Sequence, residues 1–274
     1  MTLHQVPVAN KDKVIIVGAG IGGLASSLRL SHLGYDVKVI ERANSAGGKL
    51  RTITGSTGEI DIGPTVLTLL PIFQKLFKSV GEDIFEHVDL VRQKIIARHW
   101  WPDGTSLDLY DNFETSRDAI MKFSGSSSAI EFEKYFCDTR DLFTCFDLPV
   151  MQNPRPSILD MNRAVLSNPK ILSKMHPLRT LSSLLNYKFQ DKRLRQLFGR
   201  YATYVGGSPL ESPALLSLVW QAEAQGVWSI KGGMRKLARV IEQLAKARGA
   251  SFNYGTDIKE FNTKGDRVFS ITDT

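Results

Sequence analysis

The chain has 274 residues, of which 42% are hydrophobic and 23% are charged, a composition typical of a globular protein large enough for one sizeable core or two unequal units. Lys and Arg number 35 against 28 Asp and Glu, but no zinc spacing or recognition motif accompanies this excess, so we expect no nucleic-acid partner. Residues 1–13 lack the apolar core of a signal peptide, which predicts a cytoplasmic protein. No apolar stretch is long enough to span a membrane, so we predict no membrane span. Cys137 and Cys145 lack metal-ligand spacing, which predicts free thiols and no metal site.

Residues 13–41 show the pattern of a strand, a helix and a second strand. An apolar run at 14–17 is followed by a glycine-rich turn, and apolar residues with helical spacing extend from 21 to 34. A second apolar run ends at Glu41. The residues with the G-x-G-x-x-G spacing are Gly18, Gly20 and Gly23. In this context they predict a βαβ unit that binds a dinucleotide, although the spacing alone would also suit a glycine-rich turn in an unrelated α/β protein.

Each of these residue types suits that chemistry. Gly18 allows a sharp turn out of the strand, Gly20 lets the backbone approach a pyrophosphate, and Gly23 lets the helix lie close to the sheet. The N–H groups at the start of the helix have no partner within it and can bind the phosphates. Glu41 can accept hydrogen bonds from both hydroxyls of an adenosine ribose and would repel a 2′-phosphate, which disfavours NADP. By itself, Glu41 could also be a solvated acid at a strand end.

The segment from Arg42 to Thr65 distinguishes between kinds of dinucleotide. A crossover to a third strand usually follows at this point in a plain NAD domain. Here the chain has a glycine pair, basic residues, a short strand and a Gly-Pro turn instead. Gly47 and Gly48 would allow another close backbone approach to a ligand, and Lys49 and Arg51 could offset phosphate charge.

This pattern resembles the flavin-binding fold of the amine oxidase and carotenoid desaturase superfamily, in which FAD lies extended along such a unit. The resemblance implies an α/β fold, with a Rossmann-like FAD-binding domain and an inserted, mostly helical substrate or membrane lobe. It implies that FAD is contacted by Gly18, Gly20, Gly22, Gly23, Glu41, Arg42, Gly47, Gly48 and Lys49. It also implies that the flavin region is lined by Asp61, Gly63, Pro64 and Thr65. Taken alone, the last three would suit an ordinary tight turn.

Three later segments narrow the resemblance. Residues 97–110 are similar to a strand–turn–strand of bacterial carotenoid desaturases, residues 198–209 to their central motif, and residues 226–238 to the segment that returns the chain to the flavin domain. The combination most resembles the hydroxyneurosporene (1-hydroxycarotenoid 3,4-) desaturase branch, including methoxyneurosporene dehydrogenases. The resemblance implies that a carotenoid loses two hydrogens to FAD, which oxygen or a membrane quinone reoxidises. The alternatives are a related flavoenzyme acting on another isoprenoid or an amine, and a truncated, inactive nucleotide-binding fragment.

The predicted elements divide the chain at two points. Strands are predicted at 95–101, 106–110, 250–254, 258–262 and 268–271, and helices at 69–80 and 234–248. We therefore predict an FAD-binding domain with the start of the substrate sheet at 1–111, a mostly helical substrate or membrane lobe at 112–225, and an incomplete return to the FAD domain at 226–274. Members of the resembled family are much longer, so we expect a fragment or a natural truncation.

Positive charge is concentrated in one segment. Between Met161 and Arg200 there are nine basic residues and one acidic residue. Because a carotenoid dissolves in lipid, we predict that residues 163–200 lie on an anionic membrane surface. The side chains predicted to insert are Leu178, Leu181, Leu184, Leu185, Tyr187 and Phe189. A solvated basic face on packed helices is the alternative.

The sequence identifies no catalytic acid or base and gives no prediction of oligomeric state. Arg200, Tyr201 and Tyr204 lie in the central motif and could touch substrate, but packing and backbone hydrogen bonding is the favoured interpretation. His99 and His176 have no partner pattern and are interpreted as structural.

Overall fold

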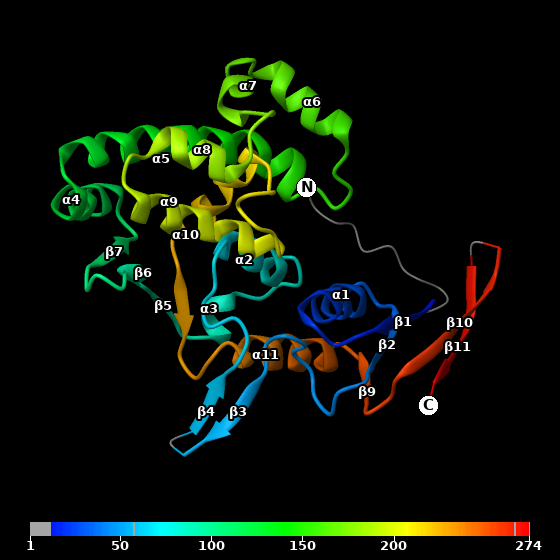
Figure 1. Cartoon of the computed structure of the whole chain (residues 1–274). Helices are drawn as coiled ribbons and strands as arrows, with labels where there is room; N and C mark the ends of the chain where they lie inside the picture. Colours follow the sequence, from blue (N-terminus) through cyan, green and yellow to red (C-terminus); the bar gives the residue numbers. More distant parts are fainter. Residues whose placement is uncertain (1–11, 57, 266, 274) are drawn as a thin grey trace. The chain divides into compact units, whose positions relative to one another are not determined.

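The computed structural model describes residues 12–56, 58–265 and 267–273 (Figure 1). They form two compact units: unit 1 comprises the chain up to Arg92 and from Trp228 onward, and unit 2 comprises Gln93–Val227. Within the described part, no helix is both long and apolar enough to cross a membrane. The prediction about a signal peptide falls mainly on residues 1–11, which lie outside the described residues.

A three-stranded parallel sheet organises unit 1. Its strands, in spatial order, are β1 (Lys13–Val17), β2 (Asp36–Glu41) and β9 (Ser251–Tyr254). Val14 lies opposite Val37 in the β1–β2 pair. Parallel neighbours require a crossover connection, and α1 (Ile21–His32) provides it between β1 and β2. The predicted strand–helix–strand unit is therefore confirmed.

Two amphipathic helices supply much of the apolar core of unit 1. Helix α1 packs against α11 (Arg235–Ala247). Leu24 and Leu28 of α1 are buried in one cluster with Leu237 and Ile241 of α11. In each helix the two residues are four positions apart, so they lie on the same face.

Smaller elements complete unit 1. They are the hairpins β3 (Thr52–Gly55)–β4 (Gly58–Asp61) and β10 (Ile258–Lys264)–β11 (Arg267–Asp273), the helices α2 (Leu70–Lys78) and α3 (Ile84–His87), and the antiparallel pair β5 (Leu90–Arg92)–β8 (Trp228–Ile230). The β5–β8 pair joins the end of the first segment of unit 1 to the start of its second segment. Unit 2 is therefore an insertion between two paired strands.

Unit 2 is mostly helical. It begins with the hairpin β6 (Ile95–Trp100)–β7 (Ser106–Tyr110), whose turn contains Gly104 at φ +81°. The elements that follow are α4 (Phe113–Ser124), α5 (Ser126–Phe146), the π-helix η1 (Asp147–Met151), α6 (Ile158–Ser167), α7 (Lys170–Met175), α8 (Leu181–Lys188), α9 (Lys192–Gly199), the 3₁₀ helices η2 (Arg200–Val205) and η3 (Ala214–Trp220), and α10 (Gln221–Ala224).

Aromatic side chains fill the core of unit 2. The rings of Phe189 and Phe198 stack with centroids 5.2 Å apart, and the Trp220 indole N–H donates to the Thr139 hydroxyl at 2.8 Å. Leu107 and Leu109 of β7 are buried in the same cluster as Phe198. The β6–β7 hairpin therefore lies in unit 2, whereas the prediction included it, as the start of the substrate sheet, in the range 1–111.

Candidate functional site

Close backbone contacts define the glycine turn after β1. Gly18 has a φ of +98°, and its N–H donates to the carbonyl oxygen of Ile40 in β2 at 2.7 Å. A Cβ atom on Gly23 would lie 1.9 Å from the carbonyl oxygen of Gly18, so any other residue would push α1 away from the sheet. These two glycines have the conformation and the packing that the motif requires.

Gly20 and Gly22 lie against open space instead. A Cβ atom on either residue would meet no atom within 4 Å. Gly20 precedes α1 with a φ of −70°, which any residue can adopt, and the first turn of α1 contains no acidic residue. The N–H groups of a first helical turn lack partners within the helix. This end of α1 therefore offers backbone donors and the room that an approaching phosphate requires.

A second glycine pair packs on this turn. The Gly47 N–H donates to the carbonyl oxygen of Ala19 at 2.9 Å. Gly48 has a φ of +60°, and a Cβ atom on it would lie 2.9 Å from the Cα atom of Gly20. The predicted close approach at Gly47 and Gly48 is thus made to the first glycine turn of the chain itself, which brings the two glycine segments together.

Glu41 ends β2 with its carboxylate directed at the glycine turn. Its Oε2 accepts a hydrogen bond from the Ala19 N–H at 2.6 Å, and its Oε1 accepts one from the Ala43 N–H at 2.8 Å. The residue is 9% exposed. A carboxylate oxygen has two acceptor positions, so each oxygen keeps one for a further donor. Glu41 is thereby oriented at the strand end and can accept from ribose hydroxyls.

Asp61 and Gly63 lie near the start of α11 and the second glycine segment. Asp61 Oδ2 accepts from the Met234 N–H at 2.9 Å, whereas its buried Oδ1 has no hydrogen-bond partner among the described residues. A Cβ atom on Gly63 would lie 1.9 Å from the carbonyl oxygen of Lys49. The other predicted contacts of this region are exposed: Arg42, Lys49, Pro64 and Thr65. Asp61 therefore retains an unused acceptor that could serve a ligand.

Unit 2 contains a buried polar cluster around Glu223, which the sequence analysis did not single out. Glu223 is 5% exposed, and its carboxylate accepts from the Arg200 guanidinium at 2.6 Å and the Tyr201 hydroxyl at 2.7 Å. The Tyr204 hydroxyl also donates to it. Arg200, Tyr201 and Tyr204 thus bond to a distant carboxylate, where the sequence favoured packing and backbone contacts. The available signal was one acid within the apolar stretch 214–224.

The cluster affects the pKa of Tyr204 and the position of Arg200. Burial, aided by the hydrogen bond to Glu223, raises the pKa of Tyr204 to about 12, so this hydroxyl stays protonated at neutral pH. Arg200 lines a cavity of about 380 Å³ together with Gln196 and Thr203. The cluster therefore holds Arg200 in place at the wall of a cavity. A contact between Arg200 and substrate stays a prediction.

His99 lies on β6 in the same unit. Burial lowers its pKa to about 4, and the positive charge of Arg200 acts in the same direction, while Glu223 and Asp108 oppose the shift. Its Nε2 is buried and has no hydrogen-bond partner in the described residues. His99 is therefore neutral at physiological pH.

The basic segment is organised differently from the prediction. Four of the six side chains that were predicted to insert into a membrane are core residues, each at most 2% exposed: Leu181, Leu184, Leu185 and Phe189. Their prediction was wrong because α8 packs its leucines against the helices of unit 2. Leu178 and Tyr187 are exposed. Lys174 and Lys188 pair with acids of α5, so they are not free for lipid headgroups.

The sequence of the chain is similar to the sequences of known proteins. The profile of the family described as "Flavin containing amine oxidoreductase" matches residues 21–273. Hydroxyneurosporene desaturase from Cereibacter sphaeroides is 41% identical over 94% of the chain and 52% of its own length. The 4,4′-diapolycopene oxygenase from a Methylomonas species is 27% identical over 96% of the chain and 52% of its own length. The chain therefore spans about half the length of the curated relatives it matches.

Among solved structures, an oxidoreductase from Methanosarcina mazei superposes with a TM-score of 0.60. It is 18% identical, and the match covers 95% of the chain and 55% of that protein. At this identity the superposition shows a shared fold alone.

Proposed function

Because this chain belongs to the flavin-containing amine oxidoreductase family, we propose that it is an FAD-dependent oxidoreductase that desaturates a carotenoid. The observation that carries the cofactor assignment is the open space over Gly20 and Gly22 at the start of α1, with the carboxylate of Glu41 held beside the same turn. The 41% identity to a hydroxyneurosporene desaturase supports 3,4-desaturation of a 1-hydroxy- or methoxy-neurosporene-type substrate.

Successive segments of unit 1 suit successive parts of FAD. The start of α1, with Gly18, Gly20, Gly22 and Gly23, would hold the pyrophosphate through backbone N–H groups and helix polarity. Each Glu41 oxygen keeps one acceptor position for a ribose hydroxyl.

The second glycine segment and the region after it would complete the site. Gly47 and Gly48 hold that segment on the first turn, and the exposed side chains of Arg42 and Lys49 would supply positive charge. The flavin region would be lined by Asp61, Gly63, Pro64 and Thr65. When bound, FAD supplies a two-electron acceptor. The residues of unit 1 named above would hold the cofactor in place.

The cofactor assignment is tested with Gly20→Val. A Cβ atom on Gly20 would meet no atom of the described residues within 4 Å and the φ of Gly20 is unstrained, so the variant should fold normally. The added side chain would occupy the space through which the pyrophosphate approaches, so we expect purified variant to contain less than about a tenth of the wild-type flavin. Flavin absorbance per protein measures this. Ser26→Val, on the exposed side of the same helix, is the control. Equal flavin content in all three proteins would refute the placement.

The reaction is tested by product analysis. The chain is produced in cells that accumulate a 1-hydroxyneurosporene-type carotenoid, and the pigments are separated and weighed by mass spectrometry. We expect a product that lacks two hydrogens and absorbs at longer wavelength, because one more double bond extends the conjugation. Unchanged pigment in cells that contain folded, flavin-loaded chain would contradict the reaction while leaving the cofactor assignment intact.

A second candidate is oxidation of another isoprenoid. The similarity to a protein named 4,4′-diapolycopene oxygenase supports this candidate at lower identity. The same product analysis separates the two, because an oxygenase adds oxygen to its product and a desaturase only removes hydrogen.

We also propose that the protein works at a membrane surface. A carotenoid dissolves in lipid rather than water, so its enzyme must collect it from a bilayer. The net positive charge between Met161 and Arg200 would favour an anionic surface. The exposed apolar side chains must, however, come from residues other than the buried leucines of α8.

A further inference from the structure

Helix α6 of unit 2 has an unusual environment. Its N-terminus is well formed, because Ser157 and Asp160 make a reciprocal capping box. Yet none of its ten residues is fully buried. Ile158, Leu159 and Leu166 are 73%, 66% and 78% exposed. Leu159 and Leu166 are seven positions apart, two helical turns, and so share one face.

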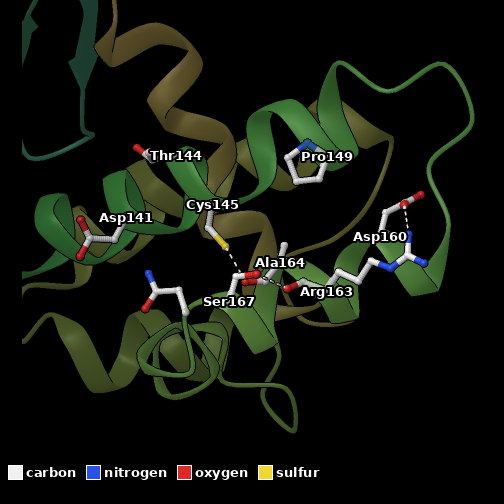
Figure 2. Close-up of a pocket in the computed structure, with 9 residues that line it drawn as sticks. Asp141, Thr144, Cys145, Pro149, Asp160, Arg163, Ala164 and Ser167 are labelled. Atoms are coloured by element: carbon white, nitrogen blue, oxygen red, sulfur yellow. Dashed lines mark hydrogen bonds and ion pairs between the residues drawn. The ribbon is translucent and has the colours of Figure 1, made fainter.

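The side of α6 that faces the protein is also loosely filled. A cavity of about 550 Å³ lies between α6, the end of α5 and η1 (Figure 2). Across it, the Cys145 thiol donates weakly to the carbonyl oxygen of Ala164 at 3.7 Å. A helix of this length is marginal in water without a packed apolar face. Neither core burial nor helix length therefore accounts for the stability of α6.

The neighbouring elements extend the exposed apolar surface. Helix α6 contacts both η1 and α7. Leu148 of η1, Leu172 of α7 and Leu178 after α7 are all more than half exposed. We use the name apolar face of unit 2 for the exposed apolar side chains of α6 and of these neighbouring elements; its residues are Leu148, Ile158, Leu159, Leu166, Leu172 and Leu178.

The charges around this face favour one kind of partner. Asp160, the acidic residue of α6, is occupied by the capping box and by Asn153. Asp147 of η1 accepts a hydrogen bond from Gln152, and Asp141 of α5 pairs with Lys174. Arg155, Lys170 and Arg179 are exposed on the same stretch of chain. Leucines bordered by exposed cations are typical of helices that lie in the headgroup region of an anionic bilayer.

We propose that the apolar face of unit 2 docks on an anionic lipid surface, with Ile158, Leu159 and Leu166 inserted and Arg155, Lys170 and Arg179 at the headgroups. The proposal rests on the proposed function only for the need to meet a membrane. It moves the insertion site from α8, where the leucines form the core, to α6, where they are exposed. Of the basic residues of the predicted segment, the exposed Lys170 and Arg179 keep an electrostatic role.

The test is sedimentation of the purified full chain with vesicles of phosphatidylcholine alone or mixed with phosphatidylglycerol. The triple variant Ile158→Ser, Leu159→Ser, Leu166→Ser should bind mixed vesicles at least about tenfold more weakly, because inserted leucines lose their burial. The control is Ile130→Ser, Leu210→Ser, which removes exposed apolar side chains elsewhere in unit 2 and should bind as wild type. Circular dichroism confirms folding of each protein.

A second variant tests the charges. Arg155→Gln, Lys170→Gln, Arg179→Gln should weaken binding to mixed vesicles by about fivefold for each charge removed, and should reduce its salt dependence. Wild-type binding by the triple serine variant, or equal loss in the control, would overturn the docking face. So would a change from dimer to monomer in the serine variant without any change in vesicle binding, which would identify the face as an interface between copies.

Flavin content of the same preparations separates this inference from the proposed function. Loss of vesicle binding with full flavin content bears on the docking face alone. Absence of flavin in a wild-type chain that still binds vesicles would count against the proposed function and leave the docking face standing.

Discussion

The start of α1 in unit 1 and the length of α6 in unit 2 are packed in opposite ways. At Gly23 of α1 there is no room for a single methyl group, because the backbone of the preceding turn fills the space. Helix α6 has no fully buried residue and a cavity against its inner side. The two helices show that a short helix can be positioned by backbone contact or be left largely unpacked, and that tolerance to substitution should differ accordingly.

Two effects of several kcal/mol are expected, the first at Gly23. Gly23→Ala places a Cβ atom 1.9 Å from the Gly18 carbonyl oxygen, so α1 must move off the sheet. We expect a loss of about 3 kcal/mol in the free energy of unfolding, the upper end for overpacking. Gly22→Ala is the matched control, because its Cβ atom meets nothing and alanine favours a helix by about 1 kcal/mol. Urea unfolding measures both. Similar stability of the two variants would show that the close approach at Gly23 is absent.

The next effect separates α8 from α6. Leu181 of α8 is fully buried, so Leu181→Ala should cost about 2–5 kcal/mol through lost burial and a cavity. Leu166→Ala on α6 should change stability by less than about 0.5 kcal/mol, because this side chain is mostly exposed. The same urea titration compares them. If the Leu166 variant lost as much stability as the Leu181 variant, α6 would be packed against protein, and its face would be unavailable for lipid.

The smallest expected effect is on the pH dependence of stability, and it concerns the buried Nε2 atom of His99. Glu41 in unit 1 has a partner on each oxygen, whereas His99 Nε2 in unit 2 has none among the described residues. The pKa of His99 is lowered to about 4 by burial, so between its ordinary value of 6.5 and 4 the unfolded chain binds more protons than the folded one. The contribution of neutral His99 is therefore fully present above pH 6.5 and is lost as the pH falls toward 4.

This pH effect is tested with His99→Phe. Between pH 7 and pH 5 the wild-type protein should lose on the order of 1 kcal/mol in the free energy of unfolding, a value discounted for the partial exposure of the His99 ring. The variant should lose that much less over the same interval, as measured by the urea midpoint at each pH. An identical pH dependence in both proteins would show that His99 is solvated and titrates normally.

Local sequence determined the strand–helix–strand part of unit 1. The predicted strand at the start of the motif has the observed bounds, Lys13–Val17, and α1 and β2 follow where the spacing placed them. The reason is that these features depend on neighbouring residues: glycine permits the turn, and apolar periodicity distinguishes strand from helix. The hairpin turn at Pro102-Asp103-Gly104 was predictable on the same grounds.

Contacts between distant residues were decided only by the tertiary structure. No sequence pattern indicated that Glu223 pairs with Arg200, Tyr201 and Tyr204, or that Gly48 lies against Gly20. The sequence also could not tell the buried leucines of α8 from the exposed ones of α6, since both helices are rich in apolar residues. Periodicity states which side chains share a face of a helix. What that face meets depends on how the remaining chain packs around it, and packing involves residues far away in the sequence.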